Sequence, residues 1–72
     1  MKVLVKFVGG LDRIQDVQEW TKDAGYFVTA RPDAGGMYQG LVRVQFIGEW
    51  RRDGDRDIPV FAEESLLEND AG

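Results

Sequence analysis

Apolar and charged side chains alternate along the first residues of the chain. In the run KVLVKFV (2–8), Val3, Val5 and Phe7 share one side, and the two lysines share the other. A period of two is typical of a strand that is buried on one face only. The sequence therefore predicts a half-buried strand here, ended by the glycine pair that follows.

The apolar period lengthens after the glycine pair. Asp12 and Gln15 are three positions apart, which resembles the capping box at the start of a helix. The residues that then recur at helical spacing are Ile14, Val17, Thr21 and Ala24. Gly25 stands where a glycine often ends a helix. We therefore expect a helix over 12–24, with Trp20 at the rim of its apolar face.

Three more strands are predicted after this helix. The segment YFVTA (26–30) is aromatic and β-branched, and MYQGLVRVQFIG (37–48) returns to alternation. The short run IPVF (58–61) contains a proline, which favours an edge position in the sheet. RPDAGG (31–36) is rich in turn-forming residues and predicts a loop.

The predicted order is therefore β-α-β-β-β. We expect a two-layer α+β domain over 1–61, in which one helix packs on a small sheet and buries Ile14 and Val17 against the first strand. Residues 62–72 are expected to form a short, flexible, acidic C-terminal tail.

Charge is unevenly divided between these two parts. The chain carries a net charge of −4 at pH 7, and its last eleven residues hold four acidic and no basic side chains. Residues 1–61 are neutral, with nine of each sign. A neutral body lacks the basic surface of a nucleic-acid binder, so direct sequence-specific binding of nucleic acid is not expected. A protein partner fits this charge distribution better.

The residue inventory argues against catalysis. The chain has no histidine, no cysteine and a single serine, Ser65, so it offers neither a Ser-His nor a Cys-His pair. We expect no enzymatic activity and no cofactor. The apolar run at the N-terminus is too short and too charged for a membrane span, so a soluble, cytoplasmic protein without membrane contact is expected.

The charged stretch GEWRRDGDRDIP (48–59) allows one metal-binding interpretation. The carboxylates at the first, third, fifth and twelfth positions of an EF-hand-like loop would be Asp53, Asp55, Asp57 and Glu64. Ile58 stands where such a loop needs glycine, and Pro59 holds it in extended geometry. A calcium-binding module is therefore kept only as an alternative, and no metal site is predicted.

A hairpin tip explains the same stretch more simply. Asp53-Gly54 is a favoured two-residue turn, and pairing across it would place Ile47 opposite Val60 and Phe46 opposite Phe61. The tryptophan near the tip could lie across the hairpin or anchor a partner, because Trp and Arg are enriched at interface hot spots. The candidate partner-binding residues are Trp50, Arg51, Arg52, Arg56 and Arg43.

Two long stretches also carry a resemblance to a known family. MKVLVKFVGGLDRIQDVQEW (1–20) and GLVRVQFIGEWRRDGDRDIPVF (40–61), followed by an acidic end, are similar to small transcription regulators of Xanthomonas phages. The resemblance implies binding to host bacterial RNA polymerase in competition with the sigma factor, in the host cytoplasm. It further implies inhibition of transcription initiation and antitermination. It rests on the overall run of residues and assigns no individual contact.

An inhibitor of a different host machine remains the alternative from another class. Such a phage protein, directed for example at a nuclease complex, would use its acidic residues to imitate nucleic acid. The tail contributes four acidic side chains to that interpretation.

Overall fold

The computed structural model of the protein describes residues 1–32 and 38–68. Strands and short helices follow one another along this part of the chain. They are β1 (Lys2–Phe7), β2 (Leu11–Asp16), α1 (Trp20–Ala24), β3 (Tyr26–Pro32), β4 (Tyr38–Asp53), β5 (Arg56–Glu63) and α2 (Glu64–Glu68).

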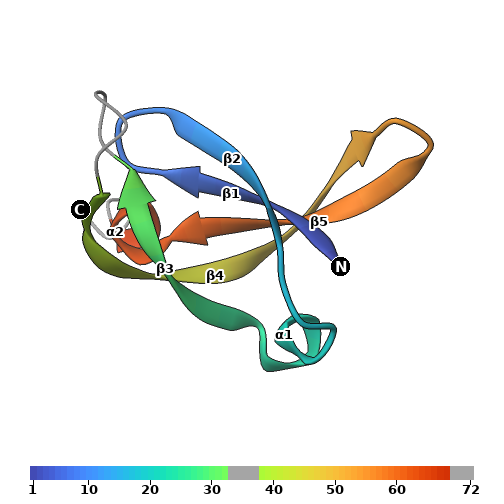
Figure 1. The fold of residues 1–72 in the computed structure, drawn as a ribbon, viewed down its shortest axis with the longest axis horizontal. Coiled ribbons are helices and arrows are strands. Elements are labelled where there is room, and N and C mark those ends of the chain that lie inside the picture. Colours follow the sequence, from blue (N-terminus) through green and yellow to red (C-terminus); the bar gives the residue numbers. More distant parts are fainter. Residues whose placement is uncertain (33–37, 69–72) are drawn as a thin grey trace.

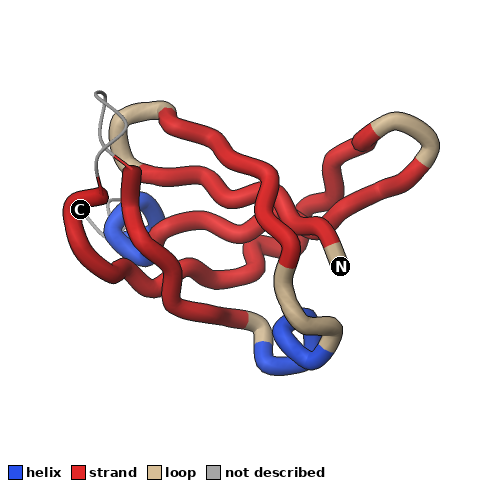
Figure 2. Tube along the Cα trace, viewed as in Figure 1, coloured by secondary structure: helices blue, strands red, loops and turns tan. Residues whose placement is uncertain are grey.

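The strands form one sheet in the order β2-β1-β5-β4-β3. Neighbouring strands are antiparallel except β1 and β5, which run parallel. The sheet curls into a half-barrel, and strands dominate the tube drawn in Figure 2. The predicted two-layer α+β domain, with one helix packed on a small sheet, is therefore wrong.

Residues 12–24 do not form the predicted helix. Residues 11–16 instead pair along the whole of β1, with Val3 opposite Gln15 and Phe7 opposite Leu11. Gly9 and Gly10 adopt φ values of 91° and 78°, which are left-handed conformations that other residues rarely take. This glycine pair reverses the chain, so the next residues lie beside β1 and join its ladder. Strand pairing has thus overridden a weak helical pattern.

Only the last part of the predicted helix is helical. Helix α1 starts at Trp20, and its C-terminal cap at Gly25 is confirmed, with a φ of 81°. The Gly25 N–H donates a 3.0 Å hydrogen bond to the Thr21 carbonyl oxygen, as expected for a left-handed cap.

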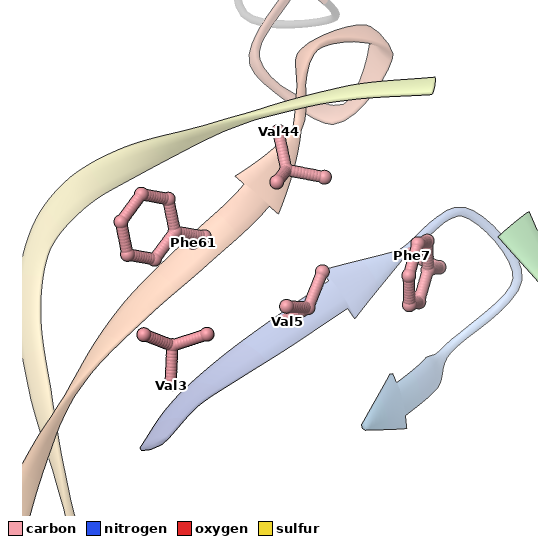
Figure 3. Close-up of a cluster of buried hydrophobic side chains, with 5 residues drawn as sticks. All are labelled: Val3, Val5, Phe7, Val44 and Phe61. Carbon is pink, nitrogen blue, oxygen red and sulfur yellow. The ribbon is translucent and has the colours of Figure 1, made fainter. Parts of the chain in front are cut away.

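The core forms two clusters, one on each face of the curled sheet. Leu4, Ile58 and Val60 make up the smaller cluster, with Ile47 packed against it, and the larger cluster lies on the other face. Its most buried members, drawn in Figure 3, are Val3, Val5, Phe7, Val44 and Phe61. Phe27 of β3 packs edge-on against Phe61 of β5, with ring centroids 5.1 Å apart. Ile14, which was expected to be buried under a helix, is exposed on β2, whereas Val17 does pack against the core. Curling of the sheet thus replaces the missing helix layer.

The β4–β5 pairing is confirmed at its base and shifted at its tip. Phe46 lies opposite Phe61 as predicted, but Trp50 lies opposite Pro59. The register changes between Phe46 and Trp50, in a bulge where Gly48 has a φ of 79°. The expected pairing of Ile47 with Val60 falls within this bulge and is not formed.

The turn itself is displaced by one residue. Asp53 pairs with Arg56, so the two-residue loop is Gly54-Asp55 and not Asp53-Gly54. Gly54 has a φ of 64°, and no non-glycine residue in the described part of the chain has a positive φ. Glycine at the first loop position alone is the pattern of a type II′ turn.

Strand β5 is central in the sheet, so the edge position predicted from its proline is wrong. Pairing with β1 begins at Val60, which lies beside Leu4, one residue after Pro59. Pro59 itself lies opposite Trp50 of β4, before the first residue that pairs with β1. The proline therefore precedes the parallel ladder, where its missing N–H would remove a hydrogen bond.

The boundary expected after residue 61 does not coincide with the end of a strand. Ala62 and Glu63 complete β5 and are buried, and 64–68 form α2. Residues 69–72 of the expected tail, 33–36 of the expected loop and Met37 at the start of the strand predicted over 37–48 lie outside the described residues.

Candidate partner-binding surface

The ends of β4 and β5 project beyond the rest of the sheet as a two-stranded arm, residues 50–59 (Figure 1). Side chains of paired residues lie on the same face of a ladder, and neighbours along a strand lie on opposite faces. Trp50 and Arg52 therefore share one face of the arm, and Arg51 and Arg56 share the other. The structure brings these four predicted residues to the arm on two faces, and of the four it gathers Trp50 and Arg56 in the lining of one groove.

The arginines of the arm alternate with acidic side chains. Arg52 Nε lies 3.6 Å from Asp57 Oδ1, and both side chains are well exposed. Asp53 and Arg56 occupy the next pair toward the tip. The three arginines and three aspartates of 50–59 leave the arm neutral overall. Exposed ion pairs of this kind contribute about 0–1 kcal/mol to stability, so they do little to fix the shape of the arm.

Trp50 combines the two roles that the sequence left open. Its ring meets the Phe46 ring edge-on, with centroids 5.8 Å apart. Lys22 Nζ lies over the ring, 5.1 Å from its centroid. The residue is nevertheless 49% exposed, so a large part of the indole can still contact a partner.

Arg43 belongs to a different part of the sheet. It lies opposite Val28 of β3, seven residues before Trp50 on β4, which corresponds to a separation of about 20 Å along a strand. Its guanidinium stacks on the Tyr26 ring, with Cζ 4.0 Å from the centroid, and its Nε lies 2.9 Å from Glu64 Oε1. Arg43 is therefore not part of a surface with the arm.

The four carboxylates of the calcium alternative are not all brought together, because Asp53, Asp55 and Asp57 line one groove on the arm but Glu64 does not. Asp53 lies at the tip of the arm, whereas Glu64 begins α2 at the far end of β5. Eight residues of extended chain separate them, a length of roughly 25 Å. Within 1–32 and 38–68, no three acidic side chains gather closely enough to hold a metal ion.

A groove runs between the arm and the N-terminal part of the chain, and we call it the arm groove. Its walls include Trp50, Arg56 and Pro59 from the arm, and Lys22, Asp16 and Met1 from the other side. Lys22 thus reaches across from α1 to the indole of the arm.

A second groove, the α1 groove, adjoins the first. Met1 and Asp16 line both. The new groove is otherwise mostly apolar, and its lining includes Val17, Trp20, Tyr26, Phe27 and Val28. Trp20 is 63% exposed, which makes it the more exposed of the two tryptophans. The sequence pattern placed Trp20 only at the rim of a helix over 12–24. No local pattern indicated that the helix would be limited to residues 20–24.

The Met1 amino group marks the junction of the two grooves. It donates to Asp16 Oδ1 at 3.0 Å and to the Val17 carbonyl oxygen at 2.7 Å. The Val17 N–H in turn donates to the Met1 carbonyl oxygen at 2.8 Å. These bonds hold the end of β2 against the start of β1 and so fix the orientation of Asp16 beside both tryptophan-lined grooves.

No protein-family model matches this chain, and no curated protein or solved structure is significantly similar to it. In the described part of the chain, neither helix is long and apolar enough to cross a bilayer.

Proposed function

We propose that the protein is a non-enzymatic regulator that binds bacterial RNA polymerase in competition with the sigma factor. It inhibits transcription initiation and acts as an antiterminator. The observation that carries the binding role is the exposure of both tryptophans, Trp20 and Trp50, in adjoining grooves on one surface. Tryptophan is enriched among interface hot spots, and hot spots cluster within an interface.

The choice of polymerase as target comes from the resemblance carried by 1–20 and 40–61. The residue inventory supports a stoichiometric mode of action, because the chain lacks histidine and cysteine. A domain of 8.1 kDa that occupies a polymerase surface would act by competing for that surface.

The arm gives less support to mimicry of nucleic acid. Its aspartates alternate with arginines, and Arg52 is ion-paired with Asp57. An imitation of the phosphate backbone needs a run of unpaired negative charge, which the arm does not present.

The test is a titration of the protein into purified Xanthomonas RNA polymerase on a promoter template. The enzyme concentration is kept well above the dissociation constant. We expect initiation to fall linearly and to reach its minimum near one inhibitor per polymerase. Adding excess sigma factor should restore initiation if the two proteins compete. Inhibition by strongly substoichiometric amounts would show catalysis, and the absence of binding would exclude polymerase as the target.

A further inference from the structure

The exposed aromatic rings around the two grooves differ in one respect. Tyr26 carries the Arg43 guanidinium on its face, and Trp50 carries the Lys22 ammonium. Every lysine and arginine of the chain lies within the described residues, and none of them covers Trp20. The most exposed of the three rings is thus the one without a cation.

The surroundings of Trp20 are acidic. Asp16 lines the same groove, and its side chain is 81% exposed even though one oxygen accepts a hydrogen bond from the Met1 amino group. Glu19 and Asp23 flank Trp20 along the chain and are also exposed. Lys22, the only basic residue of α1, points to Trp50 in the neighbouring groove. The charged side chains that flank the open indole are therefore acidic, and the positive group in the groove lining is the Met1 amino group, which is paired with Oδ1 of Asp16.

An open aromatic face next to a carboxylate suits a guanidinium group. Arginine stacks on aromatic rings through its planar cation and donates hydrogen bonds to a carboxylate at the same time. Beyond Trp20 the groove continues over Val17 and Val28, which offer an apolar wall to an aliphatic neighbour of that arginine.

We propose that the α1 groove binds an arginine side chain of the partner protein, with its guanidinium stacked on Trp20 and ion-paired to Asp16. The inference rests on the proposed role as a protein-binding module and specifies the chemistry of the segment that the module binds. It does not depend on polymerase being that partner.

The probe is the peptide N-acetyl-Leu-Arg-Leu-amide, and its control carries citrulline, a neutral isostere, in place of arginine. Both are titrated into the full-length protein at low salt, and the indole N–H signals of Trp20 and Trp50 are followed by NMR. We expect the Trp20 signal to shift saturably with the arginine peptide and at least about fivefold more weakly with citrulline, whereas Trp50 moves little.

Two variants complete the test. Asp16→Asn should weaken binding of the arginine peptide several-fold while leaving the weak citrulline binding unchanged, and Trp20→Leu should abolish both. Equal affinity for the two peptides, or an unmoved Trp20 signal, would overturn the inference even if neither variant folds, because the peptide comparison uses the wild-type chain.

The outcome is separable from that of the proposed function. If polymerase binds the wild-type protein but the two peptides are not distinguished, the arginine site is excluded and the polymerase proposal stands. If the arginine peptide is preferred but polymerase does not bind, the site stands and a different partner must be sought.

Discussion

Arg31 and Glu63 form an ion pair between the ends of β3 and β5, although they are 32 positions apart in the chain. Arg31 Nε donates to Glu63 Oε2 at 3.3 Å, and Arg31 Nη2 donates to Oε1. The same carboxylate accepts hydrogen bonds from the Val8 N–H at 2.9 Å and from Ser65 Oγ at 3.3 Å. Glu63 is only 2% exposed, so one carboxylate joins the first hairpin turn, two strands and α2.

Removing the arginine should destabilise the fold. We expect Arg31→Leu to lower the free energy of unfolding by about 2 kcal/mol, because it leaves a buried carboxylate without its charged partner. The matched control is Arg43→Leu, which breaks the exposed pair with Glu64 and should cost about 0–1 kcal/mol. Urea denaturation at neutral pH measures both. Equal losses in the two variants would contradict the structural role assigned to the Arg31–Glu63 pair.

The same cluster predicts a pH dependence of stability. Burial alone would raise the pKa of Glu63, but hydrogen bonds from Arg31 and the Val8 N–H, with the charge of Arg31, outweigh it. The pKa therefore lies below its usual value of 4.5. The unfolded chain binds the proton at higher pH than the folded one, so the stability that Glu63 contributes is complete above 4.5 and is lost as pH falls through the folded pKa.

The comparison that isolates Glu63 is with Glu63→Gln. Between about pH 5 and pH 3, the free energy of unfolding of the wild-type protein should fall more steeply than that of the variant, because the other carboxylates are common to both. Urea midpoints measured across this range provide the test. Parallel curves would show that Glu63 titrates alike in the folded and unfolded chains.

The bulge in β4 can be tested at Gly48. An added Cβ would meet no atom within 4 Å there, so the cost of Gly48→Ala comes from its φ of +79° alone. We expect a loss of about 1 kcal/mol. Glu49→Ala, in the same bulge, should change stability by less than about 0.5 kcal/mol. Thermal unfolding measures both changes. If Gly48→Ala lowers stability no more than Glu49→Ala does, the register shift before Trp50 is not present.

The contact between Lys22 and Trp50 should appear as a coupling energy. A double-mutant cycle with Lys22→Met and Trp50→Leu is expected to give about 0.5–1 kcal/mol, the range of an exposed cation–π pair. Lys2 also lines the arm groove, so Lys2→Met in place of Lys22→Met is the control and should show no coupling. A coupling near zero in the Lys22 cycle would mean that the arm is not held against α1.

The first strand, the Gly25 cap and the Phe46–Phe61 pairing could be predicted because each depends on residues close in sequence or on a simple period. Strand β2 could not. Its helical spacing was real, but the deciding factor was that Gly9 and Gly10 place 11–16 beside β1, where a six-residue ladder satisfies both backbones. A glycine pair between two apolar segments can reverse a chain as well as interrupt it.

The candidate site was predictable only in part. The sequence singled out Trp50 and the arginines of the arm by their residue types, and the structure places all four on the arm. Trp20 and the α1 groove were missed, because the groove is built from β3, α1 and the end of β2. Arg43 was grouped with the arm by charge alone, whereas its position on β4 puts it beside Tyr26. Long-range packing of this kind leaves no local signal.

The central claim is that Trp20 in the α1 groove and Trp50 in the arm groove anchor the partner. Its most direct test is the dissociation constant for Xanthomonas RNA polymerase, measured for the wild-type protein and for the double variant Trp20→Ala/Trp50→Ala. Each tryptophan anchor is worth roughly 2 kcal/mol, so the double variant should bind several hundred-fold more weakly. Leu41→Ala is the control, because Leu41 is 76% exposed and lines neither groove, and its binding should stay within about threefold of wild type. A folded double variant that binds as tightly as the wild-type protein would contradict the account.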